Sequence, residues 1–519
     1  MMETAPTQPT EQWHRLHRAT PLIRAWSTFL ALIVISGFWA FDFEDPGSLL
    51  AAARDHLWMV AAAIALILVV MLACMYLAWR MMSYSVDDEA AHMRKGVLFR
   101  TKRSAQLDRI QAIDIRKPLL ARLAGLAELT IEVAGGAGSQ VQIGFLRDEV
   151  AVALRAEILA KAAGLKAGAA QPSQVSATDL AAESGAQPQS DAAGLAAASS
   201  GATSAGALTA FEEAPEVEVT VVPAGRLLGS ALLSFGVLLG ALFLVALVVA
   251  AIVLGPQVIG IGLIPVVIGV GSLLWSRFAG EFNFRVAISP DGIRIRRGLT
   301  ETRAQTIPPG RIQAVQIAQG LLWRRQDWWR VRMTVAGYSA ETADATHQHS
   351  VLLPVGTRAE AMAALSLVLP DFGAADPVSV INAGLTGKSV KRTGEATDPY
   401  FTPNPRRSRF IDWFAWRRNG FAVTDRALLL RGGRMYRYLQ VVPHERTQSL
   451  CLQQGPLARR LGLAAFKTHV PVGMVIPQMS NLDAQTAAVL LDEQSARARQ
   501  ARAAVGPEKW MSQVVAARS

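Results

Sequence analysis

Cysteine is scarce in this chain. There are two in 519 residues, Cys74 in an apolar run and Cys451 in an alternating polar and apolar stretch. This excludes a disulfide framework, and no Cys or His spacing is typical of zinc. A catalytic constellation is also lacking, because the 8 histidines are scattered and none has a nucleophile nearby. We therefore predict a non-enzymatic protein without cofactor or metal.

Acidic residues and aromatic residues are also relatively few. The chain has 41 Asp and Glu against 52 Lys and Arg, and 7% aromatics within a hydrophobic content of 51%. Such an excess of Ala, Leu and Val indicates membrane spans, and the basic surplus then suits loops beside anionic headgroups. Basic-aromatic stretches such as Leu321–Met333 also suit single-stranded nucleic acid. They lie beside apolar runs, so we predict lipid headgroups rather than nucleic acid.

Four apolar runs are each long enough for a membrane-spanning helix of about 20 residues. They are Leu22–Phe41, Leu57–Trp79, Leu227–Leu254 and Gln257–Phe278, and we group them into hairpins over 22–79 and 223–278. None carries a central charge, which ion-coupled carriers usually need. A transporter or permease accessory component is the alternative function, but it would need a polar path between the hairpins, and the spans show none.

Charges around the first hairpin set its expected orientation. Arg15 and Arg18 precede it, Arg94 and Lys95 follow it, and the loop between its spans is mostly acidic. Positive charge stays on the cytoplasmic side. We predict a multi-pass protein of the bacterial plasma membrane with both termini in the cytoplasm.

One sequence motif occurs three times. It reads RIQAIDIRKPLLARL from Arg109, RIQAVQIAQGLLWRR from Arg311 and RTQSLCLQQGPLARR from Arg446. Each copy has a Gly thirteen residues before its first Arg, a Gln two residues after it and a second Arg thirteen residues after it. These residues are Gly96, Gly298 and Gly433; Gln111, Gln313 and Gln448; and Arg122, Arg324 and Arg459. Because the period is longer than that of a solenoid repeat, each copy is predicted to be a domain.

Each copy has the pattern of a small β domain with a closing helix. Alternating strands and glycine turns come first, and a helix follows. We place the domains at 80–163, 279–372 and 406–505. The tails are 1–21 and 506–519, a linker too polar and small to fold is 164–215, and a second linker is 373–405.

The chain resembles the bacterial PH-like (pleckstrin-homology-like) domain family, in particular its YdbT-type membrane proteins. The resemblance rests above all on WRRNGFAVTDRALLLRGG (416–433) and VVPHERTQSLCLQQGPLARRLGLA (441–464), with 118–136, 307–324 and 482–493 in support. It implies an α+β multidomain membrane protein with two transmembrane helical hairpins and three small β-barrels, each closed by a C-terminal helix. The second copy departs from the pattern, with Asp327 and Trp328 where the others have Gly-Leu.

The repeated Arg and Gln side chains have two interpretations, ligand or partner docking and a structural role inside the barrel, because an arginine fork serves both. A further candidate is the basic-aromatic segment RRSRFIDWFAWRRNG. Its arginines and aromatics suit a membrane interface, although packing on the next barrel is equally compatible. The candidate interface residues are Arg406, Arg407, Trp413, Phe414, Trp416, Arg417 and Arg418.

We therefore expect a membrane scaffold whose domains dock partner proteins or each other, with contact to anionic membrane lipids. The resemblance implies a small membrane protein with a related domain as partner, and a role in envelope stress or antimicrobial resistance. A homo-oligomer is the other assembly that we consider.

Overall fold

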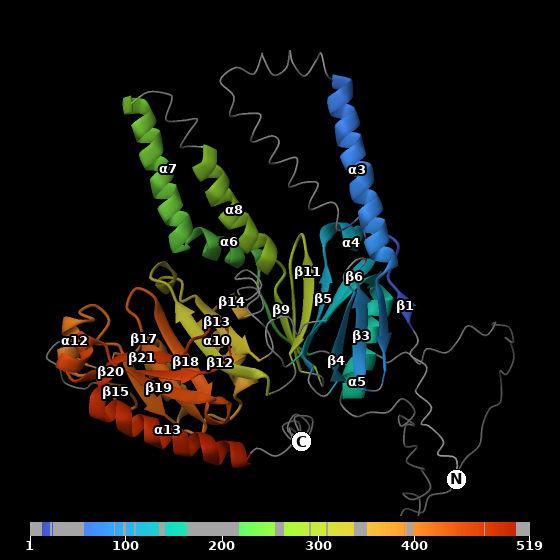
Figure 1. Cartoon of the computed structure of the whole chain (residues 1–519). Helices are drawn as coiled ribbons and strands as arrows, with labels where there is room; N and C mark the ends of the chain where they lie inside the picture. Colours follow the sequence, from blue (N-terminus) through green and yellow to red (C-terminus); the bar gives the residue numbers. More distant parts are fainter. Residues whose placement is uncertain are drawn as a thin grey trace, which may run out of the picture.

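The computed structural model describes residues 13–20, 23, 57–87, 89–96, 100–107, 110–133, 141–162, 217–254, 264–289, 292–307, 310–336, 350–388, 390–391, 398–471 and 473–504. Its strands fall into three successive units (Figure 1). The whole linker predicted at 164–215, most of the first predicted span, and the tail 506–519 lie outside the described residues.

The first unit contains β1 His14–Arg15, α3 Leu57–Arg80, β2 Ser83–Val86, β3 Ala90–Lys95, β4 Thr101–Gln106, β5 Ile110–Lys117, α4 Leu119–Leu123, β6 Leu126–Val133, β7 Val141–Arg147 and α5 Asp148–Ala162. The second contains β8 Val217–Val221, α6 Ala224–Leu232, α7 Phe235–Leu254, α8 Ile264–Glu281, β9 Arg285–Ser289, β10 Gly292–Arg297, β11 Thr302–Ile307, β12 Ile312–Gln319, η3 Leu322–Arg324, β13 Trp329–Val335, β14 Val351–Gly356, α10 Arg358–Val368 and α11 Pro377–Thr386.

The third unit contains β15 Thr402–Pro403, η4 Arg406–Phe410, β16 Gly420–Val423, β17 Ala427–Gly432, β18 Arg437–Pro443, η5 His444–Arg446, β19 Ser449–Gln453, α12 Pro456–Arg460, β20 Leu463–His469, β21 Gln478–Asp483 and α13 Ala484–Ala504. In the described residues each unit therefore has seven strands, and a helix follows the last of them, as the sequence pattern predicts.

The sheets do not follow the boundaries of the units. The strand orders are β1-β2-β3-β4, then β7-β6-β5-β11-β10-β9-β8, then β14-β13-β12-β18-β17-β16-β15, and finally β19-β20-β21. The last three strands of one unit thus continue into the first four of the next. The expectation was three small β-barrels, each closed by a C-terminal helix. The helix follows the strands in each unit, but two of the four described sheets contain strands of two units each.

Each unit begins earlier than predicted. The first strands, β1, β8 and β15, pair with β2, β9 and β16, although a long insertion separates each pair along the chain. In the first two units the insertion contains the apolar helices. The predicted tail 1–21 and the predicted linker 373–405 therefore both contribute a strand, and the second also holds α11, which packs on β17 and β18.

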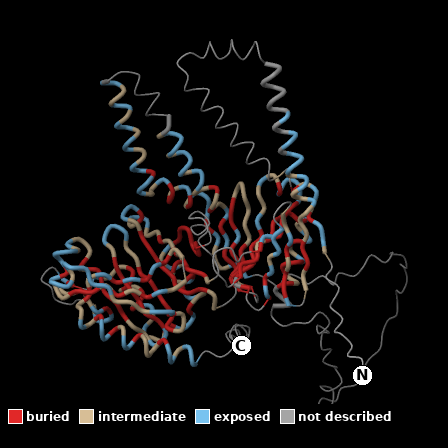
Figure 2. The backbone as a smooth tube through the Cα atoms, viewed as in Figure 1, coloured by how far each residue is buried: buried red, intermediate tan, exposed pale blue. Residues whose placement is uncertain are grey.

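The apolar helices stand on one side of the sheets, and α13 lies on the opposite side (Figure 1). Among the described residues one helix is long and apolar enough to cross a membrane, with a mean hydropathy of 3.0 over Phe235–Val253. The third predicted span is in fact two helices, because α6 ends at Leu232 and α7 begins at Phe235. Figure 2 shows α7 and α8 largely exposed, whereas the buried residues gather in the sheets.

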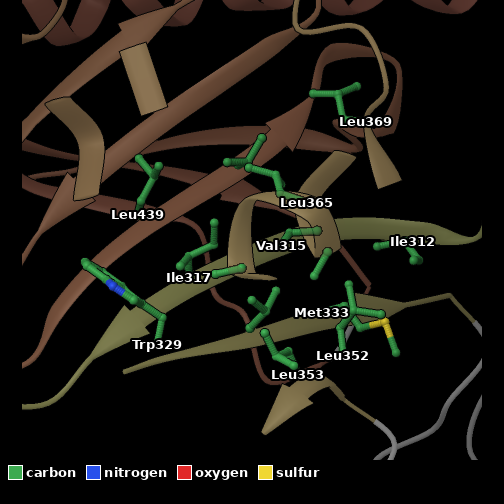
Figure 3. Packing of buried hydrophobic residues seen from close by; sticks show 14 of the residues in the cluster. Ile312, Val315, Ile317, Trp329, Met333, Leu352, Leu353, Leu365, Leu369 and Leu439 are labelled. Carbon is green, nitrogen blue, oxygen red and sulfur yellow. The ribbon is translucent and has the colours of Figure 1, made fainter. Parts of the chain in front are cut away.

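The core of the second unit includes side chains from the third. Leu439 of β18 is fully buried in the same cluster as Ile317 and Leu365 (Figure 3). Strand β17 serves two cores, because side chains alternate between the faces of a strand. Leu429 belongs to the core of the second unit, and Leu428 and Leu430 belong to that of the third.

One departure of the second copy has a backbone explanation. Asp327 has a φ of 51°, close to the 65° and 61° of Gly125 and Gly462 at the matching positions. Aspartate tolerates this left-handed conformation when its side chain is bonded locally. Here the Asp327 carboxylate accepts a hydrogen bond from the Trp329 indole at 2.9 Å.

Candidate docking site

Two antiparallel strand pairs join the three units. We call β5 with β11 the first seam and β12 with β18 the second seam. Ile113 pairs with Thr306 in the first, and Val315 pairs with Val441 in the second. In both seams the residue four after one repeated Arg faces the residue five before the next repeated Arg. The register of the repeat is therefore the same at both junctions.

The second repeated Arg crosses the seam. Arg122 Nη1 donates to the backbone carbonyl of Leu299 at 3.1 Å, and Arg324 donates to that of Arg434. Each carbonyl belongs to the residue directly after a repeated glycine, twelve positions before the next repeated Arg. We call Arg122 and Arg324 the bridging arginines, because each binds the following unit.

The repeated glycine explains why that carbonyl is available. Gly298 and Gly433 have φ values of 109° and 74°, a region that other residues rarely adopt. A Cβ atom at Gly298 would lie 1.8 Å from the Glu301 carbonyl oxygen, and one at Gly433 would lie 1.9 Å from that of Tyr436. The tight turn between the third and fourth strands therefore requires glycine.

The other repeated residues take mainly structural positions. Arg311 Nη2 donates to the Ile110 carbonyl at 3.4 Å, again across the first seam, and Gln313 is buried and donates to the Arg311 carbonyl at 3.3 Å. Arg446 is half-buried, and Gln448 is exposed. Arg109 and the side chain of Gln111 lie outside the described residues.

The first seam is held by charge. Arg116 and Arg303 face each other across the strands, and both bind the Glu301 carboxylate, with Arg116 Nη2 at 2.9 Å and Arg303 Nε at 2.7 Å. Burial alone would raise the pKa of Glu301, but its hydrogen bonds to these two arginines and their charges outweigh burial and lower it. Glu301 thus stays ionised between two cations.

The second seam is held by amides and apolar side chains. Gln440 Nε2 donates to Gln316 Oε1 at 3.1 Å and to the Ile476 carbonyl at 3.0 Å, and Gln440 Oε1 accepts from the Gln478 backbone N–H at 3.3 Å. Leu439 pairs with Ile317 directly beside it. At the position of Leu439 the first seam has Ala304, paired with Ile115.

The third copy of the bridging arginine has no following unit. Arg459 is exposed, and the described part of the chain gives its guanidinium no hydrogen-bond acceptor. Arg459 therefore leaves partner docking open at a side chain that is already on the surface.

The basic-aromatic segment divides into buried and exposed residues. Arg418 and Trp416 are each 5% exposed. Arg418 donates to the carbonyls of Gly384, Leu385 and Gly387 at 2.7–2.8 Å, and so it caps the C-terminal end of α11. Burial and the nearby Arg431 charge lower the pKa of Arg418 to about 9.

The remaining side chains of the segment lie nearer the surface. Arg407 contacts Asp483, Arg417 donates to the Val390 carbonyl at 3.3 Å, and Phe414 is half-buried beneath the Arg434 guanidinium. Arg406 is exposed. The exposed fraction reaches 74% for both Phe410 and Trp413. Nothing in the pattern of the sequence separates the buried arginine from the exposed ones.

The partners of the bridging arginines were not found from the sequence, because backbone carbonyls carry no residue signature. The repeated glycine was the available signal. Within the described residues no group of three or more His, Cys, Asp or Glu side chains could hold a metal ion.

The model of the bacterial PH domain matches residues 30–162, 231–369 and 407–498, which together are well over half of the chain. The chain belongs to the bacterial PH domain family. Each bacterial PH domain match contains one repeated Arg with its Gln and its second Arg. No curated protein and no solved structure matches the chain.

Proposed function

We propose that the protein is a scaffold anchored in the bacterial plasma membrane, which holds three PH domains side by side on the cytoplasmic face for docking. The support comes from the position of the apolar helices. In the first two units they lie between the first and second strands, and they rise from the same side of the sheets (Figure 1). In this multi-pass arrangement both termini lie in the cytoplasm.

The seams indicate what the domains dock. A bacterial PH domain here binds its neighbour by main-chain strand pairing, with a bridging arginine on a backbone carbonyl. Strand addition of this kind depends little on the partner's side chains. We infer that other proteins with PH-like domains, including a small membrane protein with one such domain, are the class of partner that the scaffold accepts.

The third unit has its own route to the membrane. The segment between β15 and β16 occupies the place in the topology where the first two units have apolar helices. It exposes Phe410 and Trp413 next to Arg406 and Arg409. Aromatic rings beside arginines bind the interface of an anionic leaflet. This shared position is the observation that carries the lipid part of the proposal.

The lipid contact can be measured on the full chain in nanodiscs. Trp413→Cys, in a Cys74→Ser and Cys451→Ser background, would carry an environment-sensitive fluorophore. A blue shift is expected with phosphatidylglycerol and a smaller one with phosphatidylcholine. Adding Arg406→Glu and Arg409→Glu should abolish the difference between the two lipids, because these charges attract the anionic surface.

The matched control places the same fluorophore at Arg499→Cys. Arg499 lies on α13, on the side opposite the apolar helices (Figure 1). It should give the same spectrum with both lipids. If the emission spectrum of the fluorophore at Trp413→Cys is the same with both lipids, the third unit does not contact the anionic surface.

A further inference from the structure

The first and the third unit each have one edge strand whose counterparts in the other units lie in the middle of a sheet. Strand β4 is the counterpart of β11 and β18, and β19 is the counterpart of β5 and β12. In the described residues β4 ends the first four-stranded sheet beside β3, and β19 ends the last sheet beside β20. The first unit thus presents the strand that would form one side of a seam, and the third unit presents the strand that would form the other side.

The two edge strands are less buried than their counterparts. All eight residues of β12 are buried, whereas no residue of β19 is. Strand β18 is mostly buried, whereas Ala105 alone is buried in β4. An open strand edge is a template for pairing with another chain.

Building on the proposed scaffold function, we propose that β19 of one copy pairs with β4 of a second copy, as a third seam that joins copies head to tail. The common register predicts the pairs. The residue four after Arg446 is Leu450, and the residue five before Arg109 is Ser104, so these two face each other. Cys451 then faces Arg103, and Leu452 faces Lys102.

A second copy satisfies the requirements of this seam. Arg459 takes the place of the bridging arginines, and Gly96 has a φ of 113° like that of Gly298 at 109°. Positive charge on β4 is no obstacle, because the paired strand β11 also carries an arginine, Arg303. The first seam keeps the apolar helices of both its units on one side (Figure 1), so a repeat of this junction leaves both copies in one membrane.

The interface is of the heterologous kind, because two different surfaces meet. Such contacts produce a ring when the rotation closes and a filament when it does not. Either assembly buries both open edges except at the ends of a filament.

Thiol crosslinking in membranes tests the register. Two differently tagged full-length chains are co-expressed, both with Cys74→Ser. One carries Arg103→Cys together with Cys451→Ser, and the other retains the native Cys451. Directly opposed cross-strand residues have Cα atoms about 4.5–5.5 Å apart, within the range of about 4.4–6.8 Å that a disulfide spans. We expect mild oxidation to give a product that contains both tags.

The control moves the thiol by one residue. Lys102→Cys replaces Arg103→Cys on the same strand, and a shift of one residue points the side chain to the other face. Its yield should be several-fold lower. Equal yields from both variants, or no product from either, would overturn the third seam. Crosslinking of Cys451 to a different protein would overturn the second copy as occupant but leave the scaffold function standing, which the nanodisc spectra test separately.

Arg459 gives an independent measurement. Arg459→Ala should weaken association of the detergent-solubilised chain about tenfold, because a charge-assisted hydrogen bond contributes about 1.5 kcal/mol. Arg460→Ala is the matched control, since Arg460 is the exposed neighbour and its counterpart Arg325 is not a bridging arginine. Equal dissociation constants for the two variants and the wild type would contradict the proposed role of Arg459.

Discussion

The two seams have the same backbone and different side chains. Both use one register and one bridging arginine on the carbonyl after a glycine. The first adds the charged group Arg116, Glu301 and Arg303, and the second adds Leu439 and the Gln316–Gln440 amide pair. The main chain therefore defines how two units join, and the side chains define which units join and under which conditions.

The largest expected effect comes from making the second seam resemble the first. Leu439→Ala removes a fully buried side chain and introduces the residue that the first seam has at Ala304. A buried Leu→Ala change costs about 2–5 kcal/mol in the free energy of unfolding. Denaturant unfolding measures it, with Leu457→Ala on the exposed face of α12 as the control. A cost below 1 kcal/mol would mean that Leu439 does not anchor the seam.

The amide pair should matter less than the leucine. Gln440→Leu leaves Gln316, the Ile476 carbonyl and the Gln478 N–H without their partner. Gln316 is buried, whereas Ile476 and Gln478 are exposed residues, so one unsatisfied buried group remains and costs about 1–3 kcal/mol. Hydrogen exchange at β18 should become faster, whereas Gln448→Leu, at an exposed side chain, should leave it unchanged. Unchanged protection of β18 from hydrogen exchange in Gln440→Leu would show that the amides do not stabilise the second seam.

Low pH should weaken the third unit through His444, which directly follows β18. His444 is buried, with Nε2 2.8 Å from the Thr424 carbonyl and Nδ1 2.9 Å from Gln494 Nε2. Burial lowers its pKa below 6.5, so the folded protein binds this proton less readily than the unfolded chain. Its stabilising effect is complete above pH 6.5 and is lost as the pH falls through the lowered pKa.

The melting temperature between pH 7 and pH 5 measures this effect. Its fall should be smaller in His444→Gln than in the wild type, because the titrating group is gone. His469→Gln, which changes an exposed histidine, should keep the wild-type slope. Identical slopes for all three proteins would assign the pH dependence to other groups.

The smallest expected effect is the salt dependence of stability, which should differ between the two seams. Glu301→Gln should cost about 0.5–1 kcal/mol at low ionic strength, because the three charges are partly exposed. About 1 M salt should remove the difference from the wild type. Glu218→Gln breaks an exposed pair with Arg285 outside the seams and is the control. If Glu301→Gln keeps its full cost in salt, the first seam is not electrostatic.

The sequence predicted the strands of each unit, its closing helix and the repeated glycine, because these follow from local periodicity. It did not predict β1, β8 and β15, since strands of two to five residues carry little pattern and insertions separate them from their partners. It also missed α11, whose polar surroundings resemble a linker. For Arg418 the sequence left a membrane interface and packing on the next barrel equally open, because aromatic neighbours do not reveal that helix carbonyls satisfy its guanidinium.

The pairing of strands across units was beyond reach for another reason. A strand edge such as that of β5 can accept any partner of suitable length, and the choice of β11 rests on contacts nearly two hundred residues away. The identical offsets in the three copies determine the register in which the strands pair. They can be interpreted in this way only once the structure shows which two strands are partners.

The double role of β17 has a consequence for how such a gene can be divided. A fragment that ends between repeats separates a sheet into halves. A fragment that ends after β18 keeps that sheet whole but removes Phe466 and Leu482, with which Leu428 and Leu430 of β17 form the core of the third unit. Neither boundary gives an intact module. Recombination that exchanges or deletes one repeat would therefore damage its neighbours, and the three repeats are expected to be inherited together.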